Sequence, residues 1–180
     1  HDIEFAGETS GEKRARIADI LKTDGQHAAV ITLPDSICWL LNIRGSDIPR
    51  NPVVHAFAIL HDDARVSLFS DPAKFDALGP DPNIDVQPWD AFEGALSVLD
   101  GPVRVDKGSA PVAVSDLLEK AGIEVAWGED PCLLPKACKN DAELEGMREA
   151  HLTDAVAMIE TLAWLDREAP EGGLTEISAA

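Results

Sequence analysis

A polar loop between two apolar segments carries the side chains best suited to chemistry. In residues 38–54, CWLLNIRGSDIPRNPVV, two arginines and an aspartate interrupt residues typical of a protein interior. Arg44 has a permanent charge and a planar fork of donors that suits carboxylates or carbonyl oxygens. Asp47 could pair with Arg44 or cap the next turn, while Gly45 and two prolines shape the backbone. The pattern supports two interpretations about equally: a binding site, or an Arg44–Asp47 pair that pins a corner to the sheet.

Two other groups of polar side chains resemble metal ligands by composition. His61, Asp62 and Asp63 stand between two strand-like segments, so the pattern favours a solvated hairpin turn. His151 and Asp154 are one helical turn apart, but no third ligand is evident, and such pairs are usually surface or packing contacts. The sequence also lacks a GxSxG nucleophile elbow and a phosphate-binding GxxxxGK loop. These patterns therefore favour neither a metal site nor an activated nucleophile at these positions.

The cysteines and the net charge restrict the remaining classes of function. Cys38, Cys132 and Cys138 are an odd set without CxxC spacing, so neither a disulfide framework nor a zinc ribbon fits. Reduced thiols in a cytoplasmic protein are predicted instead. The formal net charge of −18 opposes binding to nucleic acids and to anionic membrane surfaces. No apolar run approaches the roughly 20 residues that a membrane-spanning helix needs.

Alternating helix-like and strand-like segments must position the polar loop. Apolar residues at helical spacing predict a helix over Ser10–Asp24, and Asp35 can cap a short helix through residues 36–41. Two later strands form a hairpin, so the sheet should be mixed rather than all parallel. The whole pattern predicts an α/β fold, a mixed sheet flanked by helices. The expected strands are residues 28–33, 53–60, 65–70, 84–89, 102–106 and 123–127, and the expected later helices are residues 90–99 and 113–121.

A change in composition after residue 131 predicts a second region. The segment PCLLPKACKN has the look of an irregular linker, and residues 141–168 contain one glycine and no proline, as in a single long helix. Two adjacent apolar stripes on this helix form a face too wide for one shallow contact. We expect a domain over residues 1–131, followed over residues 132–180 by a linker and a helix whose partner lies in sequence absent from this chain. Without that partner, the helix should self-associate, for example as a homodimer, or fold back onto the sheet.

Residues 35–60, DSICWLLNIRGSDIPRNPVVHAFAIL, closely resemble the middle domain of the three-domain Xaa-Pro aminopeptidases, the aminopeptidase P family. Residues 5–17 resemble the start of that domain, and residues 139–180 resemble the opening of the family's catalytic domain. For residues 71–130 the resemblance to the family rests on the general pattern alone, without a matching motif. The family pattern Asp-x-x-x-Trp-Leu-x-Asn-x-Arg-Gly-Ser-Asp-x-x-x-Asn-Pro is matched here by Asp35, Trp39, Leu40, Asn42, Arg44, Gly45, Ser46, Asp47, Asn51 and Pro52.

The resemblance implies a parent enzyme that hydrolyses the peptide bond between an N-terminal residue and a following proline. Its pita-bread catalytic domain holds two divalent cations, usually manganese, on ligands that lie downstream of the helix over residues 141–168. For this chain the resemblance implies the ribonuclease H-like fold of the creatinase/prolidase N-terminal domain, without metal ligands. Arg44, Asp47, Asn51 and His55 then become candidates for a rim that faces the substrate cleft.

Two hypotheses of different classes follow from these observations. In the first, the chain is a fragment of a metal-dependent Xaa-Pro aminopeptidase, inactive alone, that shapes the cleft for proline-containing peptides or the assembly of the enzyme. In the second, it is a non-catalytic binding or oligomerisation module that reuses the creatinase N-terminal fold. A longer reading frame that encodes the metal ligands would favour the enzyme, and a stop near Ala180 would favour the module.

Overall fold

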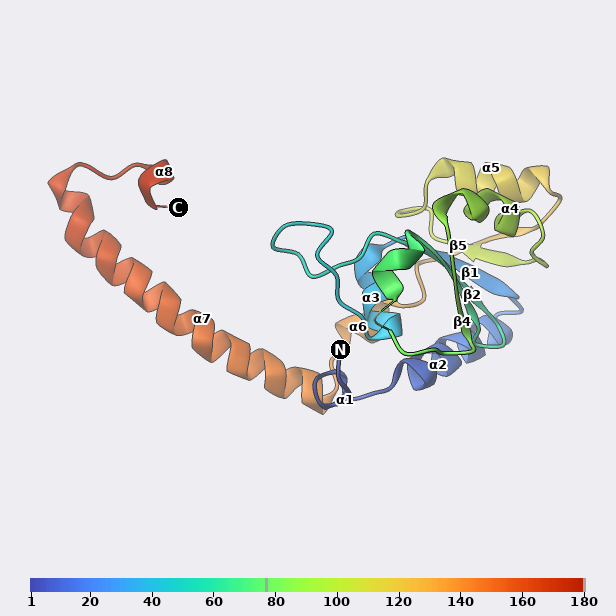
Figure 1. Cartoon of the computed structure of the whole chain (residues 1–180), viewed down its shortest axis with the longest axis horizontal. Coiled ribbons are helices and arrows are strands. Elements are labelled where there is room, and N and C mark those ends of the chain that lie inside the picture. The colour runs from blue at the N-terminus through green and yellow to red at the C-terminus, as the bar shows by residue number, and fades with distance from the viewer. Residues whose placement is uncertain (77, 180) are drawn as a thin grey trace. The chain divides into compact units, whose positions relative to one another are not determined.

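The computed structural model describes residues 1–76 and 78–179, which divide into two compact units, His1–Lys139 and Asn140–Ala180. The first unit is built around a six-stranded sheet, shown with its helices in Figure 1. The described helices include none that is long and apolar enough to cross a membrane.

The sheet is mixed, as the sequence predicts, and its strand order is β4-β3-β2-β1-β5-β6. The hairpin β2–β3 is antiparallel, and β2 is also antiparallel to the central strand β1. The three other pairs, β1–β5, β3–β4 and β5–β6, are parallel. The strands are β1 Ala28–Ile31, β2 Phe57–His61, β3 Val66–Phe69, β4 Ile84–Gln87, β5 Val103–Val105 and β6 Val125–Trp127.

Helices cover both faces of this sheet, so that alternate residues of β1 enter two different cores. Ile31 packs in the cluster under α2 and α3, whereas Val30 packs in the cluster under α4 and α5. All four residues of β1 are buried, which agrees with the continuous apolar run in the sequence. The helices of this unit are α1 Ile3–Ala6, α2 Ser10–Thr23, α3 Pro34–Leu41, α4 Phe92–Leu96, α5 Val112–Lys120 and α6 Leu133–Ala137, with short 3₁₀ turns η1 Pro72–Phe75 and η2 Trp89–Ala91.

Four local predictions are wrong in detail. The segment of residues 131–140, predicted to be an irregular linker, contains the helix α6. Residues 53–56 lie outside the strand predicted over 53–60, since β2 begins at Phe57. The helix predicted over 90–99 is shorter, with η2 followed by α4. Asp35 does not cap α3, because the helix begins at Pro34 and the cap position is occupied by Leu33, without a side-chain cap. The Asp35 carboxylate instead accepts a hydrogen bond from Lys136.

The second unit consists mainly of α7, Asp141–Glu168, whose bounds match the predicted helix. A reciprocal capping box starts it: the Asn140 side chain accepts from the Glu143 N–H, and the Glu143 carboxylate accepts from the Asn140 N–H. Large apolar side chains of α7 are exposed, with Leu152 at 71% and Ile159 at 65%. The turn η3 Ala169–Glu171 and the short helix α8 Glu176–Ala179 complete the unit.

Candidate functional site

The polar loop of residues 42–55 doubles back on itself through its own backbone. The Gly45 N–H donates to the Pro52 carbonyl at 3.2 Å, and the Asp47 N–H donates to the Val53 carbonyl at 3.3 Å. A Cβ atom added at Gly45 would lie 2.6 Å from the Val53 oxygen, closer than real Cβ atoms come. Glycine is therefore required at this position by the close approach of two backbone segments rather than by an unusual dihedral angle.

Asp47 anchors the loop, but its partner is Lys74 rather than Arg44. Its Oδ2 accepts from Lys74 Nζ and from the His55 N–H, both at 2.7 Å. The Lys74 hydrogen bond, followed by that of His55, lowers the pKa of the Asp47 carboxyl. Arg44 Nη1 donates to the Ile43 carbonyl at 2.8 Å. The alternative predicted from the sequence, an Arg44–Asp47 ion pair, is therefore wrong, although Asp47 does hold the loop in place.

The four predicted rim residues share the loop but not one pocket. Arg44 and Asp47 both line a pocket beside the loop, whereas Asn51 and His55 are exposed and lie outside its lining. The backbone at His55 is held by Ser70, whose Oγ donates to the His55 carbonyl at 2.6 Å. Asn51 and His55 are thus exposed residues of this loop, and their role as cleft-facing groups stays a prediction.

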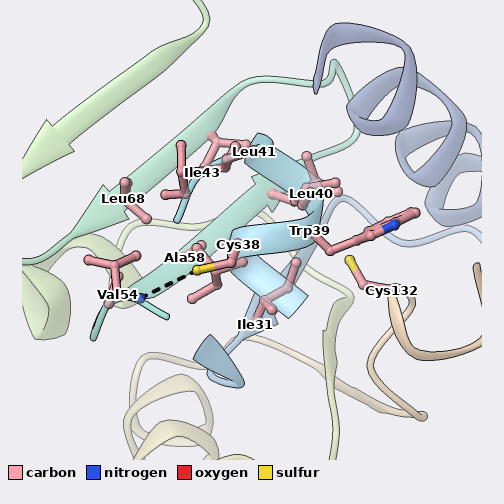
Figure 2. Packing of buried hydrophobic residues seen from close by; sticks show 14 of the residues in the cluster. Ile31, Cys38, Trp39, Leu40, Leu41, Ile43, Val54, Ala58, Leu68 and Cys132 are labelled. Carbon is pink, nitrogen blue, oxygen red and sulfur yellow. Dashed lines mark hydrogen bonds between the residues drawn. The ribbon is translucent and has the colours of Figure 1, made fainter. Parts of the chain in front are cut away.

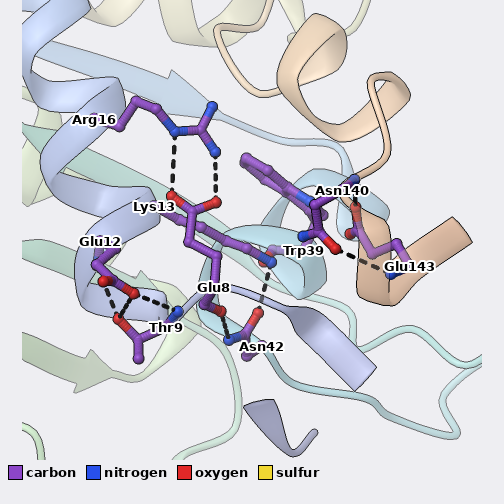
Figure 3. A network of polar contacts seen from close by, with 9 residues as sticks. All are labelled: Glu8, Thr9, Glu12, Lys13, Arg16, Trp39, Asn42, Asn140 and Glu143. Carbon is purple, nitrogen blue, oxygen red and sulfur yellow. Dashed lines mark hydrogen bonds and ion pairs between the residues drawn. The ribbon is translucent and has the colours of Figure 1, made fainter. Parts of the chain in front are cut away.

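A network of polar contacts around the buried Lys13 fixes the start of the loop (Figure 3). Lys13 is 2% exposed, and its Nζ donates to the Trp39 carbonyl at 3.1 Å and to Asn42 Oδ1 at 2.7 Å. The same ammonium lies 4.6 Å from the centroid of the Trp39 ring, and the Arg16 guanidinium lies 5.6 Å from it. Asn42 Nδ2 donates to the Glu8 carbonyl at 2.8 Å. These bonds join α2 and the segment before it to the end of α3, where the loop begins.

Two lysines important to this region were missed by reasoning from the sequence. Lys13 is spaced four residues before Ile17, which is four residues before Leu21, and all three are almost fully buried. This helical spacing predicts that the residue is buried, but the charge of a lysine side chain argues against burial, so the position was overlooked. Lys74 carries no comparable signal, because it is 27 residues from Asp47 and lies at the end of a short 3₁₀ turn.

The thiols contribute to the core rather than to a reactive site. All three cysteines are free, with Cys38 and Cys132 buried and Cys138 exposed. Figure 2 shows Cys38 Sγ accepting from the Val54 N–H, at 3.4 Å, among apolar side chains. Burial raises the pKa of the Cys38 thiol and raises that of Cys132 more strongly. Both buried thiols are therefore poor nucleophiles near neutral pH.

The HDD sequence forms the hairpin turn that its position predicts. The three side chains have separate roles: Asp62 Oδ2 lies 3.2 Å from His27 Nδ1, and Asp63 Oδ2 accepts from Arg65 Nε at 2.6 Å. His61 belongs to β2 and is partly buried, and desolvation, with a smaller effect of Arg65, lowers its pKa. The arrangement is that of a solvated turn between β2 and β3.

Metal-ligand geometry is absent from the part of the chain that the structure describes. His151 Nδ1 lies 2.7 Å from the Met147 carbonyl of its own helix, so the ring is engaged locally. Across residues 1–76 and 78–179, no three His, Cys, Asp or Glu side chains are grouped so that they could hold a metal ion. The donor sets of the described residues therefore do not fit a di-metal centre.

Comparison with known sequences gives a consistent set of relatives. The family described as the creatinase/prolidase N-terminal domain matches residues 1–143. A probable Xaa-Pro aminopeptidase P of Laccaria bicolor is 32% identical over 180 residues, which cover 95% of this chain and 28% of the relative. Xaa-Pro aminopeptidase 1 of Dictyostelium discoideum is 34% identical, over 93% of this chain and 27% of the relative. The chain thus spans less than a third of the length of these relatives.

Solved structures agree with the fold and with the family. The X-prolyl aminopeptidase of Caenorhabditis elegans, described as a cytosolic enzyme with a di-nuclear active site, superposes with a TM-score of 0.84. That match is 30% identical and covers 99% of this chain and 31% of the enzyme. The prolidase of Pyrococcus horikoshii, at 17% identity, a TM-score of 0.61, and 84% of this chain and 42% of that protein, shares the fold.

The predicted fold class is confirmed, including the mixed sheet and its flanking helices. The family profile covers the sheet unit and reaches the first residues of α7. The chain therefore belongs to the creatinase/prolidase N-terminal domain family, and its relatives are Xaa-Pro aminopeptidases.

Proposed function

We propose that this chain is part of a metal-dependent Xaa-Pro aminopeptidase, which removes the N-terminal residue that precedes proline. One observation carries the proposal: nearly the whole chain, α7 included, aligns with enzymes of that name at 30–34% identity. These relatives are more than three times as long as this chain, so their remaining length is where the chemistry would reside. The Caenorhabditis elegans relative is described as cytosolic, which supports a cytoplasmic location.

Within such an enzyme, the chain serves as a non-catalytic domain that shapes the substrate cleft, the assembly, or both. Its sheet domain, proposed as residues 1–131, presents Asn51 and His55 from a loop whose backbone is rigidly bonded, and Arg44 and Asp47 from the same loop. Exposed polar groups on a rigid scaffold can orient a peptide at little entropic cost. Two divalent cations, proposed to be manganese, would be supplied with ligands by other parts of the parent enzyme.

The remaining residues, 132–180, are proposed as a linker and the first helix of the pita-bread catalytic domain. The exposed apolar side chains of α7 support a covering partner, because a face of this size is unfavourable in water. If the helix is not covered by the parent protein, it would pair with a second copy of this chain. That observation also supports the second candidate function, a non-catalytic oligomerisation module built on the same fold.

The decisive experiment reads the complete open reading frame and assays its product. With manganese present, the full-length protein should remove the first residue of a peptide that begins Arg-Pro-Pro, and the 180-residue chain should release none. Hydrolysis restricted to peptides without proline in the second position would overturn the proposal. A reading frame that ends near Ala180 would favour the second candidate function, a non-catalytic oligomerisation module.

The proposed rim can be tested in the full-length enzyme through Asn51 and His55. Asn51→Ala and His55→Ala should raise KM for the proline peptide several-fold with little change in kcat, because these groups would orient substrate without joining the chemistry. Arg65→Ala, an exposed change on the β2–β3 turn, is the control. Unchanged KM in both rim variants would show that this loop does not meet the substrate.

A further inference from the structure

Two adjoining cavities lie beside the polar loop and share the side chains of Ile43, Phe75 and Leu78. The smaller one, of about 320 Å³, is lined by polar groups of the loop and by Lys74. The larger one, of about 540 Å³, is walled mainly by apolar side chains. Both volumes fall in the range of about 300–1,000 Å³ that is usual for small-molecule pockets. The apolar wall of the larger cavity comprises Leu41, Ile43, Leu68, Phe75, Leu78, Ile84 and Val86.

The walls of this pair of cavities are held in place by two ion pairs from different elements. Arg14, a residue of α2 that is 4% exposed, donates to Asp81 at 2.5 Å and to the Ala64 carbonyl at 3.2 Å. Asp81 belongs to the lining of the larger cavity, so this bond fixes the segment that closes it. The Lys74–Asp47 pair likewise joins two residues in the lining of the smaller cavity. The site is thus preformed rather than a gap between loose loops.

The charges of the lining leave one cation without a carboxylate. Asp81 is neutralised by Arg14, and Asp47 by Lys74. Within residues 1–76 and 78–179, the Arg44 guanidinium makes a hydrogen bond to the backbone carbonyl of Ile43, so most of its donors remain available to a ligand. Arg44 is therefore a cation of the lining that can pair with an anionic ligand.

We propose that these two cavities form one binding site for a carboxylate carried on an apolar body. The Arg44 fork would receive the carboxylate through paired N–H donors, and the hydroxyl of Ser46 lies in the same lining. The apolar body would occupy the larger cavity and displace water from the side chains of β3 and β4. A free aliphatic acid and the C-terminal residue of an apolar peptide offer this same chemistry. The site does not depend on the peptidase activity proposed above.

The test is a titration of the 180-residue chain, monitored by NMR through the amide resonances around Ile43, Phe75 and Leu78. The probes are decanoate, and N-acetyl-leucyl-phenylalanine as free acid and as C-terminal amide. Saturable shifts at these residues are expected for at least one acid, and the amide should bind about 5-fold or more weakly because it lacks the charge. The stronger of the two acids identifies the source of the carboxylate.

Matched variants separate this site from general attraction of anions. Arg44→Glu and Leu78→Glu should each weaken binding of the acid about 5-fold or more, since each puts a negative charge in the lining. Arg50→Glu changes the same charge on the same loop outside both linings, and should leave the affinity unchanged. Circular dichroism must show all three variants folded. Equal losses in Arg44→Glu and Arg50→Glu, shifts away from the named residues, or no saturation by either acid would each overturn the proposal.

Discussion

The polar loop of residues 42–55 and the helix α7 obtain their backbone order from opposite sources. In the loop, Gly45 and Asp47 bond to residues several positions away, and the Asp47 carboxylate reaches Lys74 in another element. In α7, the backbone bonds are internal, and the capping box at its start joins residues three positions apart. Substitutions in the loop should therefore act through packing, whereas substitutions in α7 should act through intrinsic helix propensity.

The two regions also differ in what their apolar side chains do. Those of the loop, such as Ile43 and Val54, are buried in the hydrophobic core on one face of the sheet. Those of α7 are exposed, and the intrinsic stability of an isolated helix is small even at this length. Stability of the chain should accordingly be concentrated in the sheet unit, and the helix should respond to partners and to local sequence.

The largest effect that would support this contrast is expected at Trp39. Trp39→Ala removes a side chain that is 8% exposed and contacts two cations, and should lower the free energy of unfolding by about 3–5 kcal/mol. Urea denaturation followed by near-ultraviolet circular dichroism measures it. Trp127→Ala, at a side chain 52% exposed, is the control and should cost less than about 1 kcal/mol. Equal losses in both variants would contradict the assignment of Trp39 to the core.

The same substitution should have opposite signs in the two regions. Gly45→Ala places a Cβ against the Val53 carbonyl and should cost about 1–3 kcal/mol through backbone displacement. Gly146→Ala, in α7, meets no atom within 4 Å and should stabilise the helix by about 0.5–1 kcal/mol. The urea midpoint reports the first change, and ellipticity at 222 nm reports the second. A neutral Gly45→Ala would mean that the loop is less tightly closed than its bonds indicate.

Asp47 should give the loop a dependence on pH. Its pKa is lowered in the folded chain, so its contribution is full above the ordinary aspartate value of about 3.9 and is lost as the pH falls through the lower folded value. Asp47→Asn should therefore cost about 1 kcal/mol at pH 7 and progressively less toward pH 2. Urea midpoints across this range test it. Asp90→Asn, at an exposed carboxylate of η2, is the control. If the loss of stability in Asp47→Asn did not change with pH, the charge of Asp47 would have no role in it.

The smallest effect concerns the start of α7. Asn140→Ala removes the side-chain acceptor of the capping box and should destabilise the first turn of the helix by about 0.5–1 kcal/mol. A loss of helical ellipticity and faster amide exchange at the first turn are expected. Asn140→Asp retains an acceptor oxygen and should restore both. Failure of the aspartate to restore them would point to a role of Asn140 other than capping.

Much of the fold was predictable because its signals are local. The bounds of α7 follow from a run without proline, and the mixed sheet follows from the hairpin around the HDD turn. The errors lie where tertiary contacts compete with local pattern. Residues 53–56 have a strand-like sequence but do not enter β2, and the N–H groups of Val53 and His55 bond to Asn51 and Asp47 instead. Asp35 is a good capping residue by type, yet its carboxylate is paired with Lys136, 101 residues away.

The sequence predicted which segment forms the candidate site, but not how the side chains of that segment pair. The motif around Arg44 and Asp47 identifies the loop and the family, because ten matching positions in one order are specific. The pairing within the loop was not predictable, since Lys74 competes with Arg44 for the same carboxylate and only the path of the chain decides between them. The same holds for Lys13, whose burial depends on Trp39 and Asn42 from another helix.

The sequence by itself determined the class of fold, the long helix, the polar loop and the family, because periodicity, caps and ordered motifs are properties of neighbouring residues. Only the tertiary structure decided which cation neutralises Asp47, which arginine remains available to a ligand, and where two cavities meet beside the loop. These outcomes depend on distances between residues far apart along the chain. Such distances are set when the sheet and its helices pack together. The pattern of neighbouring residues along the sequence does not predict them.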